Sequence, residues 1–357
     1  MITDNLVIQI IISLIVISLL VAWHELGHYT MARLLGMRVL KFCIGFGPKV
    51  VSLVRNGIEY QISALPIGGF VQIAGMSSLE EGAQEDPKSF INQPRWAQIL
   101  VVAAGPLFNY ILAFFLFVSV FWLYSPSQTP SLLVNHLVPD SPAYVAGLQE
   151  GDVITHVNGK SLSGTKEFLA FINQSQGLPL NLQIERPLKD IDAKVQQQLL
   201  HINIAPVMDA GGVYRIGVGY VPLSFTFSGA VAESFSQLWG QSTGVLSQLG
   251  QAIFGKSDAK LGGVVEVTRQ LSHAAGQGLK NLLWLMASLS VVLGLFNILP
   301  IPALDGSKIF ILCIESIIRR PINATAQLWI HGIGIIFILA LMLFLTVNDV
   351  LRIYQAG

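Results

Sequence analysis

The sequence predicts a polytopic α-helical membrane protein with four transmembrane helices, a membrane-associated β-hairpin or small sheet, and one extracytoplasmic α/β domain. Two features of its composition support this fold class. Charged residues make up 12% of the 357 residues, about half the roughly 25% of a soluble domain. Five of the six tryptophans flank apolar stretches, where amphipathic rings meet lipid headgroups. The formal net charge is zero, so nothing in the charge predicts a nucleic-acid partner.

Four apolar stretches are long enough to cross a hydrocarbon core, which requires about 20 residues. They lie between Asp4 and His24, from Arg95 to Tyr124, from Asn281 to Leu304, and from Leu328 to Val347. The first lacks the basic start and small-residue cleavage site of a signal peptide, so we expect a retained helix. Lys and Arg are concentrated in residues 24–95 and 305–327, which the positive-inside rule places in the cytoplasm. Both termini and residues 125–280 are then expected to be extracytoplasmic.

The region after the first span has strand character. Asn56-Gly57, between residues 49–55 and 58–64, predicts a β-hairpin, because both residues suit the positive φ angles of a type I′ turn. A further apolar strand is expected at residues 70–74. The polar, acidic residues 77–88 indicate a solvated loop.

The rest of the chain divides by pattern. Turn residues separate short segments that predict an α/β domain, with strands at 132–138, 153–157, 180–185 and 198–204 and helices at 143–148 and 165–173. Apolar residues then recur with a helical period over 231–253, which predicts a helix that lies on the membrane or packs on the bundle. The expected domains are 1–124, 125–222, 223–280 (amphipathic linker helices) and 281–357.

The strongest chemical signal is His24-Glu25-Leu26-Gly27-His28, which matches H-E-x-x-H. On a helix, residues four apart share a face, so both imidazoles can bind one metal ion while Glu25 faces its open coordination position. There Glu25 can accept and deliver protons during hydrolysis. Ionisable residues at the end of an apolar span also demand partners. The motif therefore predicts a catalytic Zn²⁺ site.

A catalytic zinc usually has three protein ligands, and the candidates for the third are Asp305, Glu266, Glu315 and His331. Asp305 is favoured because it ends the third span, in the run from Asn297 to Gly306, whose two prolines break the helix. Broken backbone at membrane depth is tolerated where it lines a cavity. The alternative for Asp305 is a carboxylate in an ordinary Asp-Gly turn.

Together these motifs resemble the site-2 protease family of intramembrane zinc metalloproteases. The resemblance rests on the H-E-x-x-H motif after the first span, the run 297–306, and Ala104-Gly105-Pro106 with Asn109 in the second span. Residues 44–48, 64–70 and 90–104 are similar to the branch of the bacterial regulator of sigma-E protease (RseP). Residues 141–143, 146–148 and 151–154 resemble a PDZ domain, and the chain has room for one.

The resemblance implies that Zn²⁺ is held by His24, His28 and Asp305, that Glu25 is the acid/base, and that Asn297 holds the substrate or its oxyanion. It further implies a bacterial inner (cytoplasmic) membrane protein with its active site toward the cytoplasmic side. Its substrates would be single-pass membrane proteins, such as trimmed anti-sigma factors or leftover signal peptides. Ser307-Lys308 and residues 262–266 depart from the family pattern. Asn109 is either an interhelical hydrogen-bond partner or a site residue.

The hairpin region has a possible role in substrate binding. A transmembrane substrate hides its carbonyl groups in helical hydrogen bonds, so it must be extended before hydrolysis. An edge strand near the metal could pair with the extended segment by β-augmentation. We expect this edge at residues 58–64 or 70–74, and the candidate substrate-binding residues are Ile58, Tyr60, Ile62, Gly68, Gly69 and Phe70. A purely structural hairpin is the alternative.

Two other classes of function compete with a protease. A membrane-anchored PDZ scaffold with an inactive or structural metal site would need neither Glu25 nor an open coordination position. A zinc transporter would need further ligands along a path through the spans, whereas the sequence offers one cluster. The PDZ-like domain would either bind peptides or act as a steric filter that excludes large substrate domains.

Overall fold

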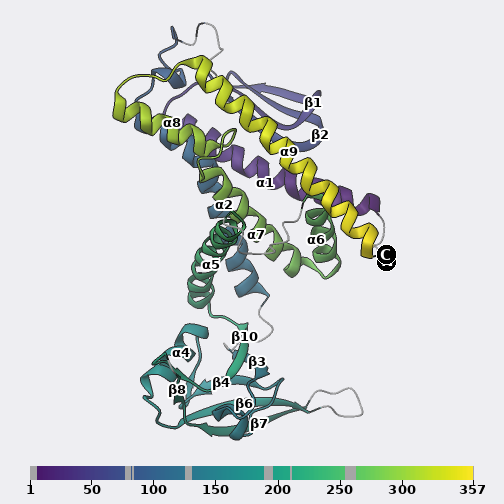
Figure 1. The fold of residues 1–357 in the computed structure, drawn as a ribbon, viewed down its shortest axis with the longest axis vertical. Coiled ribbons are helices and arrows are strands. Elements are labelled where there is room, and N and C mark those ends of the chain that lie inside the picture. Colours follow the sequence, from purple (N-terminus) through teal and green to yellow (C-terminus); the bar gives the residue numbers. More distant parts are fainter. Residues whose placement is uncertain are drawn as a thin grey trace. The chain divides into compact units, whose positions relative to one another are not determined.

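The computed structural model describes residues 6–76, 82, 84–124, 131–188, 196–209, 211–253 and 263–356 (Figure 1). The chain divides into two compact units, Met1–Leu116 with Gln237–Gly357, and Phe117–Ser236. Residues 77–81 and 83 of the expected acidic loop, 125–130 of the expected second domain, and Gly262 lie outside the described residues.

Four described helices are long and apolar enough to cross a membrane, which confirms the four predicted spans. They are α1 (Leu6–Leu34), α2 (Arg95–Leu123), α7 (Leu279–Ile298) and α9 (Ala324–Ala356). The third was expected to continue to Leu304, but α7 ends at Ile298 because Pro300 and Pro302 cannot continue the helical hydrogen bonds. The chain becomes helical again in α8 (Asp305–Ile318), so Asp305 begins a helix and does not end a span.

The first unit is held together by two clusters of buried apolar side chains on either side of the H-E-x-x-H segment. One cluster joins α1, α7 and α6 (Val264–Gly276) through Val16, Leu20, Met286 and Leu271. The other joins Ala32 of α1 to Val101 of α2 and Leu312 of α8. Between them α1 and α2 approach closely: a Cβ at Gly27 would lie 2.3 Å from the Ala104 carbonyl oxygen. Gly27 is therefore required for this packing.

The sheet after α1 is formed by β1 (Val39–Arg55) and β2 (Ile58–Ile73), two long, bent strands. The first part of β1 pairs on both sides, because Phe42 lies opposite both Tyr60 and Val71. The last part of β1 pairs with the start of β2, with Leu53 opposite Tyr60. The spatial order is therefore 51–55, 58–62, 41–44 and 69–73. The predicted turn is confirmed, since Asn56 and Gly57 have φ angles of 53° and 77°.

The second unit is built on an antiparallel sheet in the order β10 (Val218–Ser224), β3 (Ser131–Leu137), β4 (Val153–Val157), β6 (Leu180–Leu188) and β7 (Gln196–Ile204). The short β5 (Lys160–Ser161) pairs with β4, and β8 (Val207–Met208) pairs with β9 (Tyr214–Arg215). Phe168 and Ile172 of α4 (Thr165–Gln174) pack on buried residues of the sheet. The four predicted strands and two predicted helices are present, although α3 (Pro142–Val145) is shorter than expected. The strand β10 was not predicted, because Gly219 and Pro222 are unfavourable in strands.

The helix predicted at 231–253 is α5, which begins earlier, at Phe227, and ends at Ile253. Both cysteines are free, with Cys43 buried and Cys313 exposed.

Candidate metal centre

Among the described residues, one cluster of His, Cys, Asp and Glu side chains could hold a metal ion, and it consists of His24, His28 and Asp305. The Nε2 atoms of the two histidines are 3.2 Å apart. Asp305 Oδ2 lies 2.9 Å from His24 Nε2 and 3.2 Å from His28 Nε2. Residues 281 positions apart in the sequence therefore converge on one point.

The spacing of these three atoms fits a zinc ion. Zinc binds His nitrogen and carboxylate oxygen at about 2.1 Å, which in a tetrahedral site separates neighbouring donor atoms by roughly 3.4 Å. Gly105 of α2 leaves the space that the histidine rings occupy. A Cβ at Gly105 would lie 2.3 Å from His28 Nε2 and 2.8 Å from His24 Nε2.

Asp305 is positioned by the non-helical segment between α7 and α8. Ala303 has a φ angle of 74°, a left-handed conformation that costs a non-glycine residue about 1–2 kcal/mol. Gly306 follows the ligand directly, and a Cβ there would lie 2.3 Å from the Ile298 carbonyl oxygen. The chain therefore turns tightly against the end of α7, and this turn places the Asp305 carboxylate in the first turn of α8.

Glu25 lies beside the cluster and is held by β2. Its Oε2 accepts a hydrogen bond of 3.1 Å from the N–H of Val71. Val71 belongs to residues 69–73, which form an outer strand of the β1–β2 sheet. This outer strand therefore runs past Glu25.

The register decides between the two expected edge strands. Tyr60 and Ile62 lie in the segment 59–62, which is paired on both sides and is therefore not a free edge. Ile58 comes directly before this segment and is paired with Arg55. Within the part of the chain that the structure describes, residues 69–73 have a sheet partner on one side only, at residues 39–44. Gly69 and Phe70 therefore lie on the edge next to Glu25. Gly68 precedes them with a φ angle of 82°.

The second ring nitrogens of both histidines contact α2. His28 Nδ1 lies 2.8 Å from the Val101 carbonyl oxygen, and His24 Nδ1 lies 3.0 Å from Asn109 Nδ2. The sequence left two roles open for Asn109 and gave no indication of Val101. No sequence signal could have identified Val101, because the contact uses its backbone.

The charges around Asp305 are unusual. Burial opposes ionisation of the Asp305 carboxyl, but the two histidines outweigh burial and hold its pKa below the usual range. One turn later, Lys308 donates a hydrogen bond of 2.7 Å to the Met76 carbonyl and lies 4.9 Å from the centre of the Phe90 ring. Burial lowers the pKa of Lys308 to about 8, although the Asp305 carboxylate opposes this shift. Lys308 had been noted only as a departure from the family pattern.

The other candidate ligands are engaged elsewhere. Glu315 forms an ion pair with Arg95, and Glu266 forms one with Arg269. His331 is absent from the cluster. Asn297 donates its amide N–H to the Leu293 carbonyl, one turn earlier in α7.

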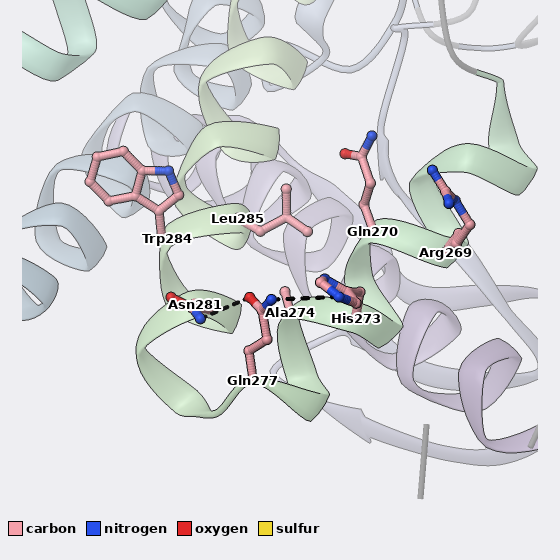
Figure 2. A pocket seen from close by; sticks show the side chains of 8 residues that line it. All are labelled: Arg269, Gln270, His273, Ala274, Gln277, Asn281, Trp284 and Leu285. Carbon is pink, nitrogen blue, oxygen red and sulfur yellow. Dashed lines mark hydrogen bonds between the residues drawn. The ribbon is translucent and has the colours of Figure 1, made fainter. Parts of the chain in front are cut away.

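A cavity of about 420 Å³ between α6 and α7 is lined by none of the three candidate metal ligands (Figure 2). Three of its polar side chains contact one another: Asn281 donates to Gln277 Oε1 at 2.9 Å, and Gln277 Nε2 lies 3.5 Å from His273 Nε2. The metal centre is therefore a compact cluster of two buried histidines and a partly exposed aspartate, separate from this cavity.

Comparison with known proteins places this geometry in context. The model of peptidase family M50 matches residues 12–341. A protein of Clostridium perfringens named as a zinc metalloprotease is 33% identical over 96% of this chain and 98% of its own length. Another, from Campylobacter jejuni, is 32% identical over 97% of this chain and 94% of its own length. The regulator of sigma-W protease RasP of Bacillus subtilis is 28% identical over 97% of this chain and 99% of its own length.

Proposed function

This chain belongs to peptidase family M50, the site-2 proteases, and from that premise we propose that His24, His28 and Asp305 hold its zinc and that Glu25 is its acid/base. The family makes the chain a multi-pass membrane protein and a zinc metalloprotease of intramembrane proteolysis. The single observation that carries the site is the convergence of Asp305 Oδ2 on both histidine Nε2 atoms. Zinc, when bound, acts as a Lewis acid and makes water nucleophilic at neutral pH.

Glu25 moves the protons of the reaction. Its carboxylate accepts a proton from the attacking water and delivers it to the nitrogen of the leaving amine. The Val71 N–H bonds to Oε2, which leaves lone pairs of the carboxylate for this proton exchange. This hydrogen bond also fixes the direction in which the carboxylate points.

The outer strand 69–73 supplies the surface on which the substrate is extended. When a transmembrane segment leaves its helical conformation, its backbone carbonyl groups need new hydrogen-bond partners within the bilayer. Pairing with the free side of this strand provides them and brings the segment past Glu25. Asn297 then holds the substrate or its oxyanion, for which its amide must turn away from Leu293.

The remaining proposals concern topology and substrate. Basic residues favour cytoplasmic placement of residues 24–95 and 305–327, so the metal centre faces the cytoplasmic side. The antiparallel sheet of the second unit, from β3 to β10, is then extracytoplasmic, and we call it the sheet unit. We assign the sheet unit as a PDZ-like domain that binds peptides or excludes large substrate domains. The name of the Bacillus subtilis relative, a regulator of a sigma factor, favours anti-sigma factors as substrates, with leftover signal peptides as a second group.

Replacement of Glu25 by Gln tests the assignment. The purified full chain and the variant should each hold about one zinc, while cleavage of a model transmembrane substrate should fall by about 10²–10⁴ in the variant. Glu266→Gln is the matched control, since Glu266 pairs with Arg269 and should be dispensable. Equal cleavage by Glu25→Gln and wild type would remove the role given to Glu25. Zinc without cleavage by the wild type, across several substrates, would favour a membrane-anchored scaffold.

A further inference from the structure

Asn109 of α2 is a buried amide with an unmet hydrogen-bonding need. Its side chain is fully buried, and its Nδ2 lies 3.0 Å from His24 Nδ1. Its Oδ1 is buried without a hydrogen-bond partner among the described residues. Such an unsatisfied atom costs about 1–3 kcal/mol, so the amide calls for an explanation beyond packing.

Metal binding determines which atom of the amide must face the histidine. His24 Nε2 points toward His28 and Asp305, so Nε2 must carry the lone pair that binds a metal. A neutral imidazole then carries its proton on Nδ1. An N–H at Nδ1 needs an acceptor, and Oδ1 is the only acceptor of the amide. A half-turn of the amide exchanges Oδ1 and Nδ2 without moving any other atom. Nδ2 then takes the position that has no partner among the described residues.

We propose that Asn109 is a positioning residue for the metal centre, whose Oδ1 accepts the Nδ1–H of His24 and so fixes the tautomer and plane of that ring. The proposal rests on the zinc ligands proposed above. Metal-binding histidines usually donate their second ring N–H to an oxygen acceptor, and loss of that acceptor weakens metal binding by about 10–100-fold.

The second histidine shows the same arrangement with a backbone acceptor. His28 Nδ1 lies 2.8 Å from the Val101 carbonyl oxygen. Val101 and Asn109 are eight residues apart, about two helical turns, and Gly105 lies midway between them under the rings. One helix therefore provides an acceptor for each ring and the space for both.

Contacts on both sides of Asn109 keep it in place. The Trp23 indole N–H donates to the backbone carbonyl of Phe108 at 2.8 Å. Trp23 directly precedes His24 in the chain, and Phe108 directly precedes Asn109. The hydroxyl of Ser290 in α7 donates to the backbone carbonyl of Asn109 at 2.8 Å, and Ser290 is fully buried. The His24 ring is thus connected through α2 to α7.

The test compares zinc affinity in variants of the full chain in detergent. Asn109→Leu removes the acceptor, and Asn109→Asp keeps an acceptor but removes the donor. Gln98→Leu is the matched control, because Gln98 is also a buried amide on α2 but bonds to carbonyls of residues 90–93. Zinc dissociation constants are measured by competition with a chelator, and cobalt absorption spectra report the ligand geometry.

We expect Asn109→Leu to bind zinc about 10–100-fold more weakly, and Asn109→Asp and Gln98→Leu to bind it as wild type does. Wild-type zinc affinity in Asn109→Leu would overturn the proposal. Should Asn109→Leu not fold, Asn109→Asp decides the matter alone: a large loss of affinity or an altered cobalt spectrum would show that the amide donates and does not accept. Asp305→Ala is measured alongside. If Asp305→Ala loses zinc while Asn109→Leu binds zinc as wild type does, only the inference about Asn109 is overturned. If Asp305→Ala retains zinc, the proposed ligand set is overturned as well.

Discussion

The two compact units of the chain each hold a carboxylate that is largely withdrawn from solvent, Asp152 in one and Asp305 in the other, and the two differ in what faces the carboxylate. In the sheet unit, Asp152 receives hydrogen bonds of 2.7 and 2.8 Å from the Arg186 guanidinium and one from the Gln149 N–H. The other unit, Met1–Leu116 with Gln237–Gly357, is the helical unit. There, the side chains at ion-pair distance from Asp305 among the described residues are two histidines. A bidentate arginine satisfies a carboxylate fully, whereas two imidazoles can bind a cation together with it. Burial of a carboxylate therefore does not distinguish the two sites; the chemistry of the partner does.

Removal of each carboxylate should break a different property, and this is the largest effect we expect. Asp305→Ala should reduce zinc from about one ion per chain to a small fraction and abolish cleavage, because two ligands do not hold a catalytic zinc. Asp152→Ala should leave zinc and cleavage unchanged and lower the free energy of unfolding of the sheet unit by about 3 kcal/mol. Metal analysis and hydrogen exchange of the sheet strands measure the two effects. Loss of zinc in Asp152→Ala would contradict the division of roles.

A methyl group under the histidines should have a smaller effect. Gly105→Ala places a Cβ 2.3 Å from His28 Nε2, so the rings must shift, and we expect zinc affinity to fall by about 10–100-fold. Gly240→Ala is the control, since a Cβ at Gly240 in α5 meets no atom within 4 Å. The control should stabilise the protein by up to about 1 kcal/mol through helix propensity. Equal zinc affinity in both variants would show that the space at Gly105 is not needed.

The edge strand should show the smallest effect. Val71→Pro removes the N–H that bonds to Glu25, and a hydrogen bond to a charged group is worth about 1.5–3 kcal/mol. Cleavage should therefore fall by at least roughly tenfold while zinc content stays the same. Leu53→Pro, on the opposite outer strand, should have a much weaker effect on cleavage. Unchanged turnover in Val71→Pro would exclude the strand from substrate positioning.

Much of the fold was predictable because it follows from local patterns. The four spans follow from runs of apolar residues, and the hairpin turn follows from the preference of Asn56-Gly57 for positive φ angles. The bounds were less predictable, since α7 ends at Ile298 and the prolines after it introduce a non-helical segment. The first part of β1, at residues 39–48, was not predicted because it contains glycines and a proline, which are unfavourable inside strands. The pairing of this part of β1 is irregular.

The candidate site was predictable only in part. His24 and His28 lie four residues apart on one helix, so their spacing alone places them on one face. The order of the strands, which makes residues 69–73 the edge, depends on the double pairing of residues 41–44. Sequence periodicity is the same for an edge strand and an inner strand, so it could not distinguish them.

The sequence by itself determined the apolar spans, the metal-binding motif and the turns, because each depends on residues that are neighbours along the chain. Only the tertiary structure decided that Asp305 joins the histidines, that Glu25 meets Val71, and that α2 offers Val101 and Asn109 to the two rings. These contacts join segments far apart in the chain, and several use backbone atoms that every residue carries. Their positions follow from how the helices pack and not from any local pattern of residues.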